Sequence, residues 1–254
     1  MNEAMFRLEG KVALVTGSAT GIGQSISIAL AKQGADIAIS DMREVSLDET
    51  AEKTAKYGHK IYQVGIDVRS INQIKKSINA VLAEFGRIDI LVNNAGINRP
   101  AVGLDVIESD WDDIFNTNVK GGFFMSQVVA RTMIEKKWGR IIFISSQAGI
   151  IGIPGQSTYC SSKGAVIQLA RTLGLEWAKY GITVNTVAPT VVETNLNRER
   201  LKNPQFLKFI LDKIPAGKLA TKEDMAAAVV YLASEEARMV NCTTLLVDGG
   251  YTAW

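Results

Sequence analysis

Short runs of β-branched residues alternate with longer stretches of helical periodicity, and this alternation limits the fold more than any other feature of the chain. The strand candidates are Val12–Val15, Asp36–Ser40, Ile61–Val64, Ile88–Val92, Arg140–Ile144, Thr183–Val187 and Thr244–Val247. Strand–helix repetition without a Pro- or Ser-rich linker predicts one α/β domain over residues 1–254, built on a single doubly wound parallel sheet. Right-handed crossovers then put helices on both faces and the ligand site at the carboxyl ends of the strands.

The longest predicted helix follows the fourth strand candidate. Ser109, with Asp112 three residues later, has the pattern of a capping box, which predicts a helix that opens there and runs to about Lys137. Gly121 and Gly122 interrupt this helix at a cost in helix propensity. Two adjacent glycines would permit close packing against a neighbouring element.

Residues 191–217 depart from the alternation. The stretch TNLNRERLKNPQFLKFILDKIP is charged and amphipathic, and it is longer than a crossover between two strands requires. An excursion of this kind over the ligand edge predicts a substrate lid. An ordinary pair of surface helices is the alternative interpretation.

Composition and charge argue against several classes of function. Lys and Arg total 28, and Asp and Glu total 26, so the net charge is +2, and neither nucleic acid nor an anionic membrane is expected as a partner. Residues 1–10 lack the apolar core of a signal peptide, and no run of about 18 apolar residues predicts a membrane span. Two distant cysteines, Cys160 and Cys242, fit a reducing cytoplasm. His59 is the only histidine, so Ser-His-Asp hydrolysis and a metal site are poorly supported.

A glycine-rich turn, TGSATGIG at residues 16–23, lies between the first strand and a predicted helix over Ile22–Gln33. Gly17 suits a tight turn, Gly21 lets the backbone approach a pyrophosphate, and Gly23 allows close helix–strand contact. The helix N-terminus offers free N–H groups and a positive dipole to phosphates. A purely structural turn is the alternative, but the position between strand and helix favours dinucleotide binding.

The choice of cofactor depends on Asp41, at the end of the second strand and 24 residues after Gly17. A carboxylate there accepts hydrogen bonds from both ribose hydroxyls of NAD and repels the additional phosphate of NADP. Position 20 is Thr, so no cation precedes Gly21 to attract that phosphate. Arg43 is the counter-argument, because a guanidinium nearby can bind a phosphate. We therefore expect NAD in preference to NADP.

Tyr159 and Lys163 form a Tyr-x-x-x-Lys pair in a helical stretch, which places the phenol and the ammonium on one helical face. A free phenol has a pKa near 10, and lowering it to about 7 needs roughly 4 kcal/mol of preferential phenolate stabilisation. Lys163 and an oxidised nicotinamide are suitable sources. Ser146, 13 residues before Tyr159, ends the fifth strand and can hydrogen-bond a substrate oxygen. Coincidence for the pair and a strand-end turn for the serine are the alternatives.

These motifs together resemble one family. Thr-Gly-x-x-x-Gly-x-Gly, Asn93-Asn94-Ala95-Gly96, Asn118, Ser146, Tyr-x-x-x-Lys and the ending Val247-Asp248-Gly249-Gly250 occur in the order that is typical of short-chain dehydrogenases/reductases. The resemblance covers essentially the whole chain. It implies a Rossmann-type sheet of seven strands in the order 3-2-1-4-5-6-7, and usually a homotetramer built partly through the helices that hold Asn118 and Tyr159.

The resemblance also implies a role for each site residue. Tyr159 would be the catalytic acid/base, Lys163 would lower its pKa and bind the nicotinamide ribose, Ser146 would orient the carbonyl or alcohol, and Asn118 would hold a water in a proton relay. The residues expected at the cofactor are Gly17, Thr20, Gly21, Ile22, Gly23, Asp41, Asp67, Val68, Asn94, Ala95, Gly96, Tyr159, Lys163, Pro189, Val192 and Thr194. Among them the resemblance implies Asp67 and Val68 at the adenine, Asn94 near the ribose, and Val192 and Thr194 at the nicotinamide amide. One departure concerns Thr190, which follows Pro189 where the family usually has Gly and adds a side chain beside the nicotinamide pocket.

Several stretches, NNAGINR, EWAKYGITVN, LDKIPAGK and VDGGYTAW, look similar to sugar-acid and polyol dehydrogenases, especially those that act on gluconate or deoxygluconate. Arg99 is placed to pair with a substrate carboxylate, although an exposed loop arginine is often merely solvated. The other candidate substrate residues are Ser146, Gln147, Gln156, Thr190 and Asn195.

Three hypotheses follow. The first is an NAD-linked dehydrogenase of a sugar acid or polyol. The second is an NADPH-dependent 3-oxoacyl thioester reductase, which Asp41 and the near-neutral charge disfavour. The third is a catalytically silent nucleotide-binding regulator, which the complete set of Asn118, Ser146, Tyr159 and Lys163 disfavours, because binding alone does not require Tyr159.

Overall fold

Parallel strands form one sheet in the order β3-β2-β1-β4-β5-β6-β7 within residues 5–194 and 197–253, which the computed structural model describes. The strands are β1 (Val12–Thr16), β2 (Asp36–Asp41), β3 (Ile61–Gly65), β4 (Ile90–Asn93), β5 (Gly139–Ile144), β6 (Ile182–Pro189) and β7 (Thr244–Val247). The predicted strands are confirmed, with ends that differ by at most two residues. Strand β1 pairs with β2 on one side and with β4 on the other. Strands β2 and β3 therefore extend the sheet on one side of β1, and β4 to β7 extend it on the other.

Burial along the strands explains their sequences. Every residue of β1, β4, β5 and β6 is buried, whereas the edge strands β3 and β7 are partly exposed. A parallel sheet covered on both faces needs apolar side chains pointing both ways, and the near-continuous Val/Ile/Leu runs supply them.

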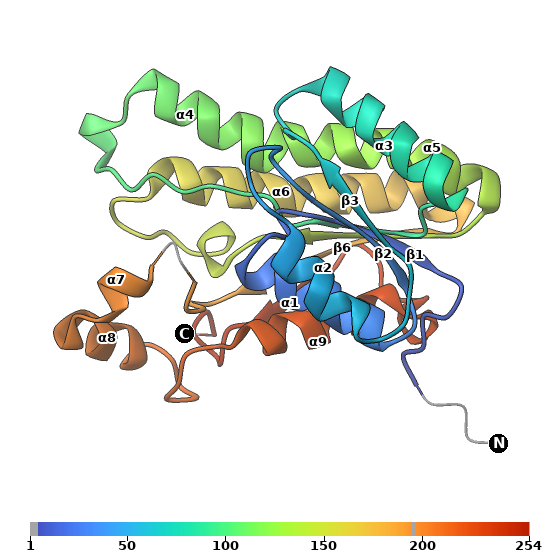
Figure 1. Cartoon of the computed structure of the whole chain (residues 1–254). Helices are drawn as coiled ribbons and strands as arrows, with labels where there is room; N and C mark the ends of the chain where they lie inside the picture. The colour runs from blue at the N-terminus through green and yellow to red at the C-terminus, as the bar shows by residue number, and fades with distance from the viewer. Residues whose placement is uncertain (1–4, 195–196, 254) are drawn as a thin grey trace.

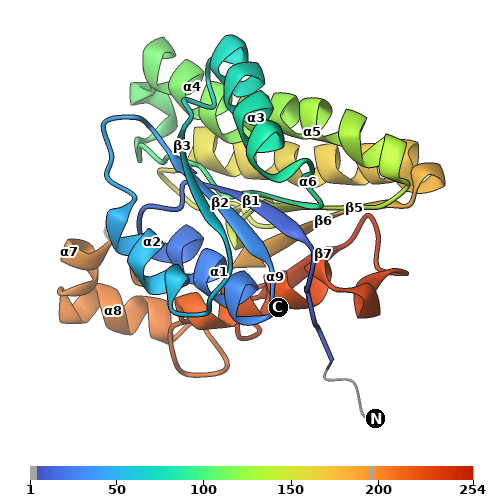
Figure 2. The same cartoon turned by 45° about the vertical axis from the view of Figure 1, so that its right-hand side comes forward.

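Helices cover the sheet in two layers (Figures 1 and 2). One face carries α1 (Gly21–Lys32), α2 (Asp48–Ala55) and α9 (Lys222–Ala233). The other carries α3 (Ile71–Phe85), α4 (Glu108–Phe115), α5 (Gly122–Lys136) and α6 (Ser157–Trp177). Two separate apolar cores result, one on each face of the sheet. Among the described residues, no helix combines the length and the apolar character needed to cross a bilayer.

The long helix after β4 differs from its prediction in two ways. It begins at Glu108, after an extended Ile107 that provides no side-chain cap, so the capping box of Ser109 and Asp112 is wrong. Carboxylates in the first turn, including Glu108, stabilise the helix N-terminus through its dipole instead. The helix is also not continuous, because a π-helical turn over Asn116–Gly121 separates α4 from α5.

The predicted close packing of the glycine pair is confirmed. A Cβ at Gly121 would lie 2.9 Å from atoms of Val68, and a Cβ at Gly122 would lie 2.9 Å from the ring of Phe143. Only glycine lets the π-helical turn approach the sheet this closely. The approach brings Asn118, in the middle of the turn, to the carboxyl end of β4.

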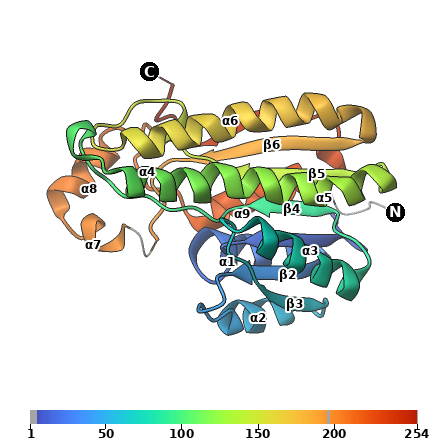
Figure 3. The ribbon, with the colours of Figure 1, turned by 90° about the horizontal axis from the view of Figure 1, so that it is seen from above.

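The predicted lid contains two short helices, α7 (Arg198–Leu201) and α8 (Pro204–Leu211). Asn203 caps α8 by accepting hydrogen bonds from the backbone of Gln205 at 2.9 Å and Phe206 at 3.2 Å. Figure 3 shows both helices at the end of the sheet where the loop before α4 lies. The lid role stays a prediction. Asn195 lies outside the described residues.

Gly121→Ala should lower the free energy of unfolding by about 1–3 kcal/mol, because the new methyl group overlaps Val68 in a packed core. For a chain of this size the melting temperature should fall by roughly 2–4 °C per kcal/mol, measured by scanning calorimetry. Gly103→Ala is the control, since no atom lies within 4 Å of its Cβ position. Equal melting temperatures for the two variants would contradict the packing role.

Candidate active site

The glycine-rich turn has the backbone geometry that its sequence predicts. Gly17 and Gly21 both have φ of +63°, a left-handed conformation that strongly favours glycine. A Cβ at Gly23 would overlap the carbonyl oxygen of Gly17, so glycine is also required where α1 crosses the turn. Thr20 precedes α1 without a side-chain capping bond, so the first N–H groups of the helix have no side-chain acceptor at that residue. This arrangement fits a bound pyrophosphate.

Two residues from neighbouring strand ends hold the turn in place. The Asn94 side-chain amide donates to the carbonyls of Thr16 and Gly17, both at 2.9 Å. The Thr16 hydroxyl accepts from the backbone N–H groups of Asn94 and Ala95, both at 3.1 Å. Asn94 was predicted beside the cofactor ribose, and its amide here positions the turn. The positioning role of Thr16 was not predicted.

A second support of the turn was also missed from the sequence. The Ser18 hydroxyl accepts from the Ser40 N–H at 2.8 Å and donates to the Ser40 carbonyl at 3.1 Å. Thr50 on α2 donates to the Ser18 carbonyl at 2.8 Å. Isolated Ser and Thr residues carry no periodic or spacing signal, so only the fold reveals this network.

Asp41 lies at the end of β2 and reaches the glycine-rich turn. One carboxylate oxygen accepts from the Ala19 N–H at 3.2 Å, and the other accepts from the Met42 N–H at 2.9 Å. The exposed Arg43 side chain packs its aliphatic stem over Gly65, at the end of β3. Asp41 and Arg43, the two residues expected to decide between a ribose hydroxyl and a ribose phosphate, therefore both lie at this edge of the sheet.

Asp67 and Val68 follow β3 at the same edge. Arg69 holds the Asp67 carboxylate through its Nη2 at 2.9 Å and its Nε at 3.0 Å, and this hydrogen bonding lowers the pKa of Asp67. Val68 is buried against Gly121. The structure thus brings the two predicted adenine-side residues next to the π-helical turn.

Tyr159 and Ser146 meet at the carboxyl ends of the central strands, where α6 begins beside the end of β5. Burial raises the pKa of Tyr159 to about 12, and a hydrogen bond with the Ser146 side chain opposes this rise. The Ser146 hydroxyl oxygen accepts from the Ala148 N–H at 3.1 Å, so its own hydrogen is the one directed at the Tyr159 oxygen. The phenol is therefore a very weak acid in the protein without cofactor.

Lys163 lies one turn further along α6 and is 5 % exposed. Its ammonium donates to the carbonyl of Ile144 at 2.8 Å and lies 5.6 Å from the centroid of the Tyr159 ring. Burial lowers the pKa of Lys163 to about 8. The expected lowering of the Tyr159 pKa by Lys163 stays a prediction.

Asn118 joins the loop after β4 to α6. Its side-chain amide donates to the Ile97 carbonyl at 3.0 Å and to the Ser162 hydroxyl at 3.1 Å, while its oxygen accepts from the Ile97 N–H at 2.8 Å. Ser162 in turn donates to the Tyr159 carbonyl at 2.8 Å. Asn118 is thus linked to the backbone of Tyr159 through Ser162, a residue that no sequence motif had singled out.

A small cavity of about 10 Å³ lies beneath this assembly. Its polar lining includes Thr16, Asn93, Asn118 and Lys163. The buried Asn93 Oδ1 has no hydrogen-bond partner among the described residues. The volume and the polar groups suit one water molecule, which fits a proton relay at Asn118 and Lys163.

The segment after β6 returns to the glycine-rich turn. The Cγ2 of Thr194 lies 3.9 Å from the position that a Cβ on Gly21 would occupy. Val192, two residues earlier in the chain, is buried. Thr190 is also buried, and its hydroxyl oxygen has no hydrogen-bond partner among the described residues. Pro189 ends β6 alongside these residues. Of the predicted nicotinamide-side residues, Thr194 is therefore the one that the structure places against the glycine-rich turn.

The candidate substrate residues differ in exposure and in the partners that they already contact. Arg99 is half exposed, and its guanidinium pairs with Asp110 at 3.0 Å and Asp113 at 2.8 Å. Gln147 is buried, and the Gln156 oxygen accepts from the Asn98 amide at 3.2 Å. A carboxylate must compete with two aspartates for Arg99, and that role stays a prediction. Within the described part of the chain, no cluster of three or more His, Cys, Asp or Glu side chains is arranged to hold a metal ion.

Lys163→Met should unfold at a temperature a few degrees higher than the wild type at pH 7, because burying a charged ammonium costs stability. The folded pKa is near 8 and the unfolded pKa is 10.5, so between these values the unfolded wild type binds more protons and its stability rises with pH. The advantage of the variant should therefore shrink from pH 7 to pH 10. Melting curves for both proteins, with Lys76→Met as the exposed control, measure this difference. A pH-independent difference would contradict it.

Comparison with known proteins agrees with this geometry. Residues 17–252 match the family model described as Enoyl-(Acyl carrier protein) reductase. The chain is 41% identical over 249 residues to a 2-dehydro-3-deoxy-D-gluconate 5-dehydrogenase of Dickeya dadantii, which covers 98% of each chain. It is 37% identical over 244 residues to a 3-oxoacyl-(acyl-carrier-protein) reductase of Thermotoga maritima, which covers 96% of this chain and 98% of the relative.

A similar solved structure is a gluconate 5-dehydrogenase from Burkholderia cenocepacia in complex with NADP and tartrate. It superposes with a TM-score of 0.94 at 37% identity and covers 98% of both chains. The sheet order, the glycine-rich turn and the Ser146–Tyr159–Lys163 assembly, taken with these likenesses, show that the chain is an oxidoreductase of the short-chain dehydrogenase/reductase family.

Proposed function

We propose that the chain transfers a hydride between NAD(H) and a secondary alcohol or ketone of a sugar acid or polyol. The observation that carries the proposal is the meeting of Tyr159, Ser146 and Lys163 at the carboxyl ends of β4–β6, beside a turn that fits a pyrophosphate. Bound nicotinamide supplies the hydride acceptor or donor. The side chains of the protein control the proton and the position of the substrate oxygen.

Ser146 and Tyr159 would hold the substrate oxygen between them. Because the Ser146 oxygen already accepts from Ala148, its hydroxyl donates to the substrate oxygen and fixes the reacting carbon. Tyr159 takes the hydroxyl proton during oxidation and returns it during reduction.

The raised pKa of Tyr159 defines what cofactor binding must achieve. Moving it from about 12 to near 7 requires roughly 7 kcal/mol of preferential phenolate stabilisation. The ammonium of Lys163, 5.6 Å from the ring centroid, and the positive charge of oxidised nicotinamide are the proposed sources. Tyr159 is thereby inactive as a base until the cofactor is in place. The cavity beside Asn118 and Lys163 supports the relay that carries the proton away.

We propose NAD as the preferred cofactor. Asp41 presents a carboxylate at the ribose end of the turn, where like charge opposes a phosphate. The solved gluconate 5-dehydrogenase from B. cenocepacia binds NADP, and Arg43 is the group in this chain that favours the same choice.

The assembly and location of the protein are also proposals. Exposed apolar side chains along α4 and the loop before it, among them Leu104, Ile107 and Trp111, support subunit contacts in a homotetramer. The free thiols of Cys160 and Cys242 fit a cytoplasmic location.

Tyr159→Phe should bind NADH like the wild type and lose most turnover, because it removes only the transferable proton. The assay compares NAD and NADP reduction with aldonates, polyols and hydroxyacyl thioesters, and NADH binding is followed by fluorescence. Retention of a tenth of the wild-type kcat would show that Tyr159 is not the acid/base. Turnover of the thioesters alone would favour the 3-oxoacyl reductase.

Asp41→Ala should weaken NAD binding by removing the ribose hydrogen bonds and should improve NADP binding by removing the repelling charge. The ratio of kcat/KM for NAD to that for NADP should fall by about tenfold or more, the size of one lost charge-assisted hydrogen bond. A wild-type preference for NADP would show that Arg43 determines the choice.

A further inference from the structure

The positive charges at α7 differ in how they are neutralised. Arg198 pairs with Glu193 at 3.2 Å, and Lys202, just after the helix, pairs with Glu199 at 2.7 Å. Arg200 forms no ion pair with any described residue. Its charge is therefore available to an anion from outside the chain.

The Arg200 guanidinium is nevertheless held in place. It stacks on the Phe206 ring of α8, 4.1 Å from the ring centroid. Stacking uses the flat face of the guanidinium and leaves the N–H groups at its edge free, in the planar arrangement that matches both oxygens of a carboxylate. A stacked arginine also loses less side-chain freedom when it binds an anion.

Arg200 lines an open hollow of about 230 Å³. The other walls are the loop after β4, at Pro100–Val102, and the segment before α6, at Pro154–Gln156. Ala101 and Gln156 form a parallel bridge, and the Ala101 N–H donates to the Gly155 carbonyl at 2.9 Å, so the two loops make one continuous wall. The volume lies below the range of about 300–1,000 Å³ that holds drug-sized ligands, so it suits a small molecule.

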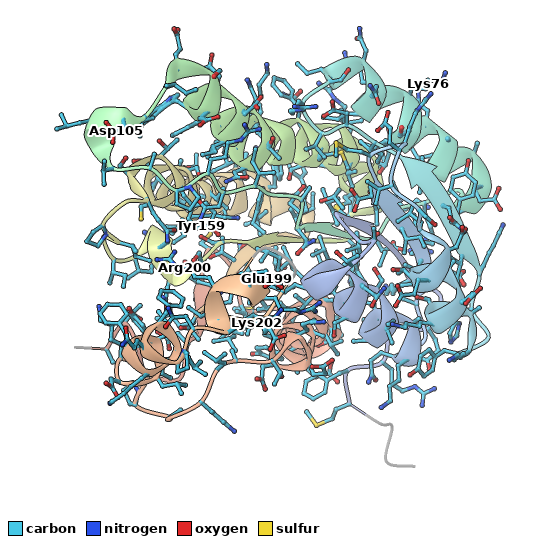
Figure 4. All side chains as sticks on the ribbon, turned by 60° about the vertical axis from the view of Figure 1, so that its left-hand side comes forward. Lys76, Asp105, Tyr159, Glu199, Arg200 and Lys202 are labelled. Carbon is cyan, nitrogen blue, oxygen red and sulfur yellow. The ribbon has the colours of Figure 1, made fainter. Side chains whose placement is uncertain are left out.

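One wall of the hollow leads directly into α6, the helix that carries Tyr159. Gln156 precedes α6 and Tyr159 lies in the first turn of that helix. Figure 4 shows Arg200 on α7 facing the same end of the sheet as Tyr159. Asn197, just before α7, accepts from the Thr194 N–H and donates to the Val192 carbonyl, both at 2.9 Å. These bonds tie α7 to the nicotinamide-side segment and set the position of Arg200 relative to the cofactor.

Arg99, the arginine that the sequence favoured, differs in each of these respects. Two aspartates of α4 already neutralise it, and it does not line the hollow. A substrate carboxylate would have to displace Asp110 or Asp113 to reach Arg99, whereas Arg200 presents no such competitor among the described residues.

We propose, on the basis of the proposed function, that Arg200 binds the carboxylate of the substrate and thereby makes this site selective for sugar acids over neutral polyols. The carboxylate rests at the Arg200 end of the hollow, and Gln156 contacts the hydroxyls between that end and the carbon that faces Tyr159. Fixing one end of the molecule sets which carbinol reacts.

The test uses Arg200→Gln, which keeps a polar, hydrogen-bonding side chain and removes the charge. Two measurements are made on the full chain. Calorimetry gives the Kd of gluconate for the NADH-loaded protein, and steady-state kinetics gives kcat and KM for gluconate and for glucitol, its neutral counterpart. Arg198→Gln is the matched control on the same helical turn, and Arg99→Gln tests the alternative arginine.

Arg200→Gln should weaken gluconate binding about 10- to 150-fold, the range for a charge-assisted hydrogen bond. The loss should fall mainly on KM and exceed the loss for glucitol at least tenfold, whereas Arg198→Gln should stay within about twofold of the wild type. Arg200→Lys should recover part of the loss. Equal losses on gluconate and glucitol, an unchanged gluconate Kd, or a selective loss in Arg99→Gln alone would each overturn the proposal.

The two proposals fail separately. Wild-type protein that binds gluconate through Arg200 but oxidises neither substrate with NAD or NADP would refute the proposed reaction and leave the carboxylate site standing. Wild-type protein that oxidises glucitol but does not bind gluconate would refute the carboxylate site and leave the reaction standing.

Discussion

The hydrogen bonds between Asn94 and the glycine-rich turn connect the two halves of the site. They join the ends of β1 and β4, the strands between which the sheet order reverses. From Asn94 the chain continues to Ile97, which Asn118 holds at both backbone groups, and Asn118 reaches Tyr159 through Ser162. The glycine-rich turn and the start of α6 are thus connected through these hydrogen bonds, and displacement of Asn94 would disturb both.

Burial at the candidate active site disfavours charge on both Tyr159 and Lys163. Burial raises the pKa of Tyr159 and lowers the pKa of Lys163, so the charged form of each residue is destabilised in the protein without cofactor. A positively charged nicotinamide nearby would stabilise the Tyr159 phenolate, the form that acts as a base in the proposed reaction. In the proposed reaction the oxidised cofactor therefore supplies the positive charge that the site needs to stabilise the Tyr159 phenolate.

The strands and the glycine-rich turn were predictable because each leaves a pattern in the sequence, and the strand order followed from the resemblance to the family. Buried parallel strands require unbroken apolar runs, and Gly17 and Gly21 adopt a conformation that other residues rarely accept. The start of α4 was not predictable, because a serine in the first helical turn resembles a capping residue when the backbone is unseen. The different environments of Arg99 and Arg200 depend on which carboxylates lie nearby in space.

The π-helical turn over Asn116–Gly121 gives the site a dependence on chain length as well as on residue type. Such a turn holds one residue more than an α-helical turn, and one residue corresponds to about 100° of rotation about the helix axis. The additional residue lets α4 and α5 each keep its apolar side toward the protein while Asn118 points at the loop after β4. A chain shorter by one residue here would form one continuous α-helix without the π-helical turn, and this helix would still cover the sheet. Asn118 would then point away from Ile97, and the fold would persist while the link between the two halves of the site was lost.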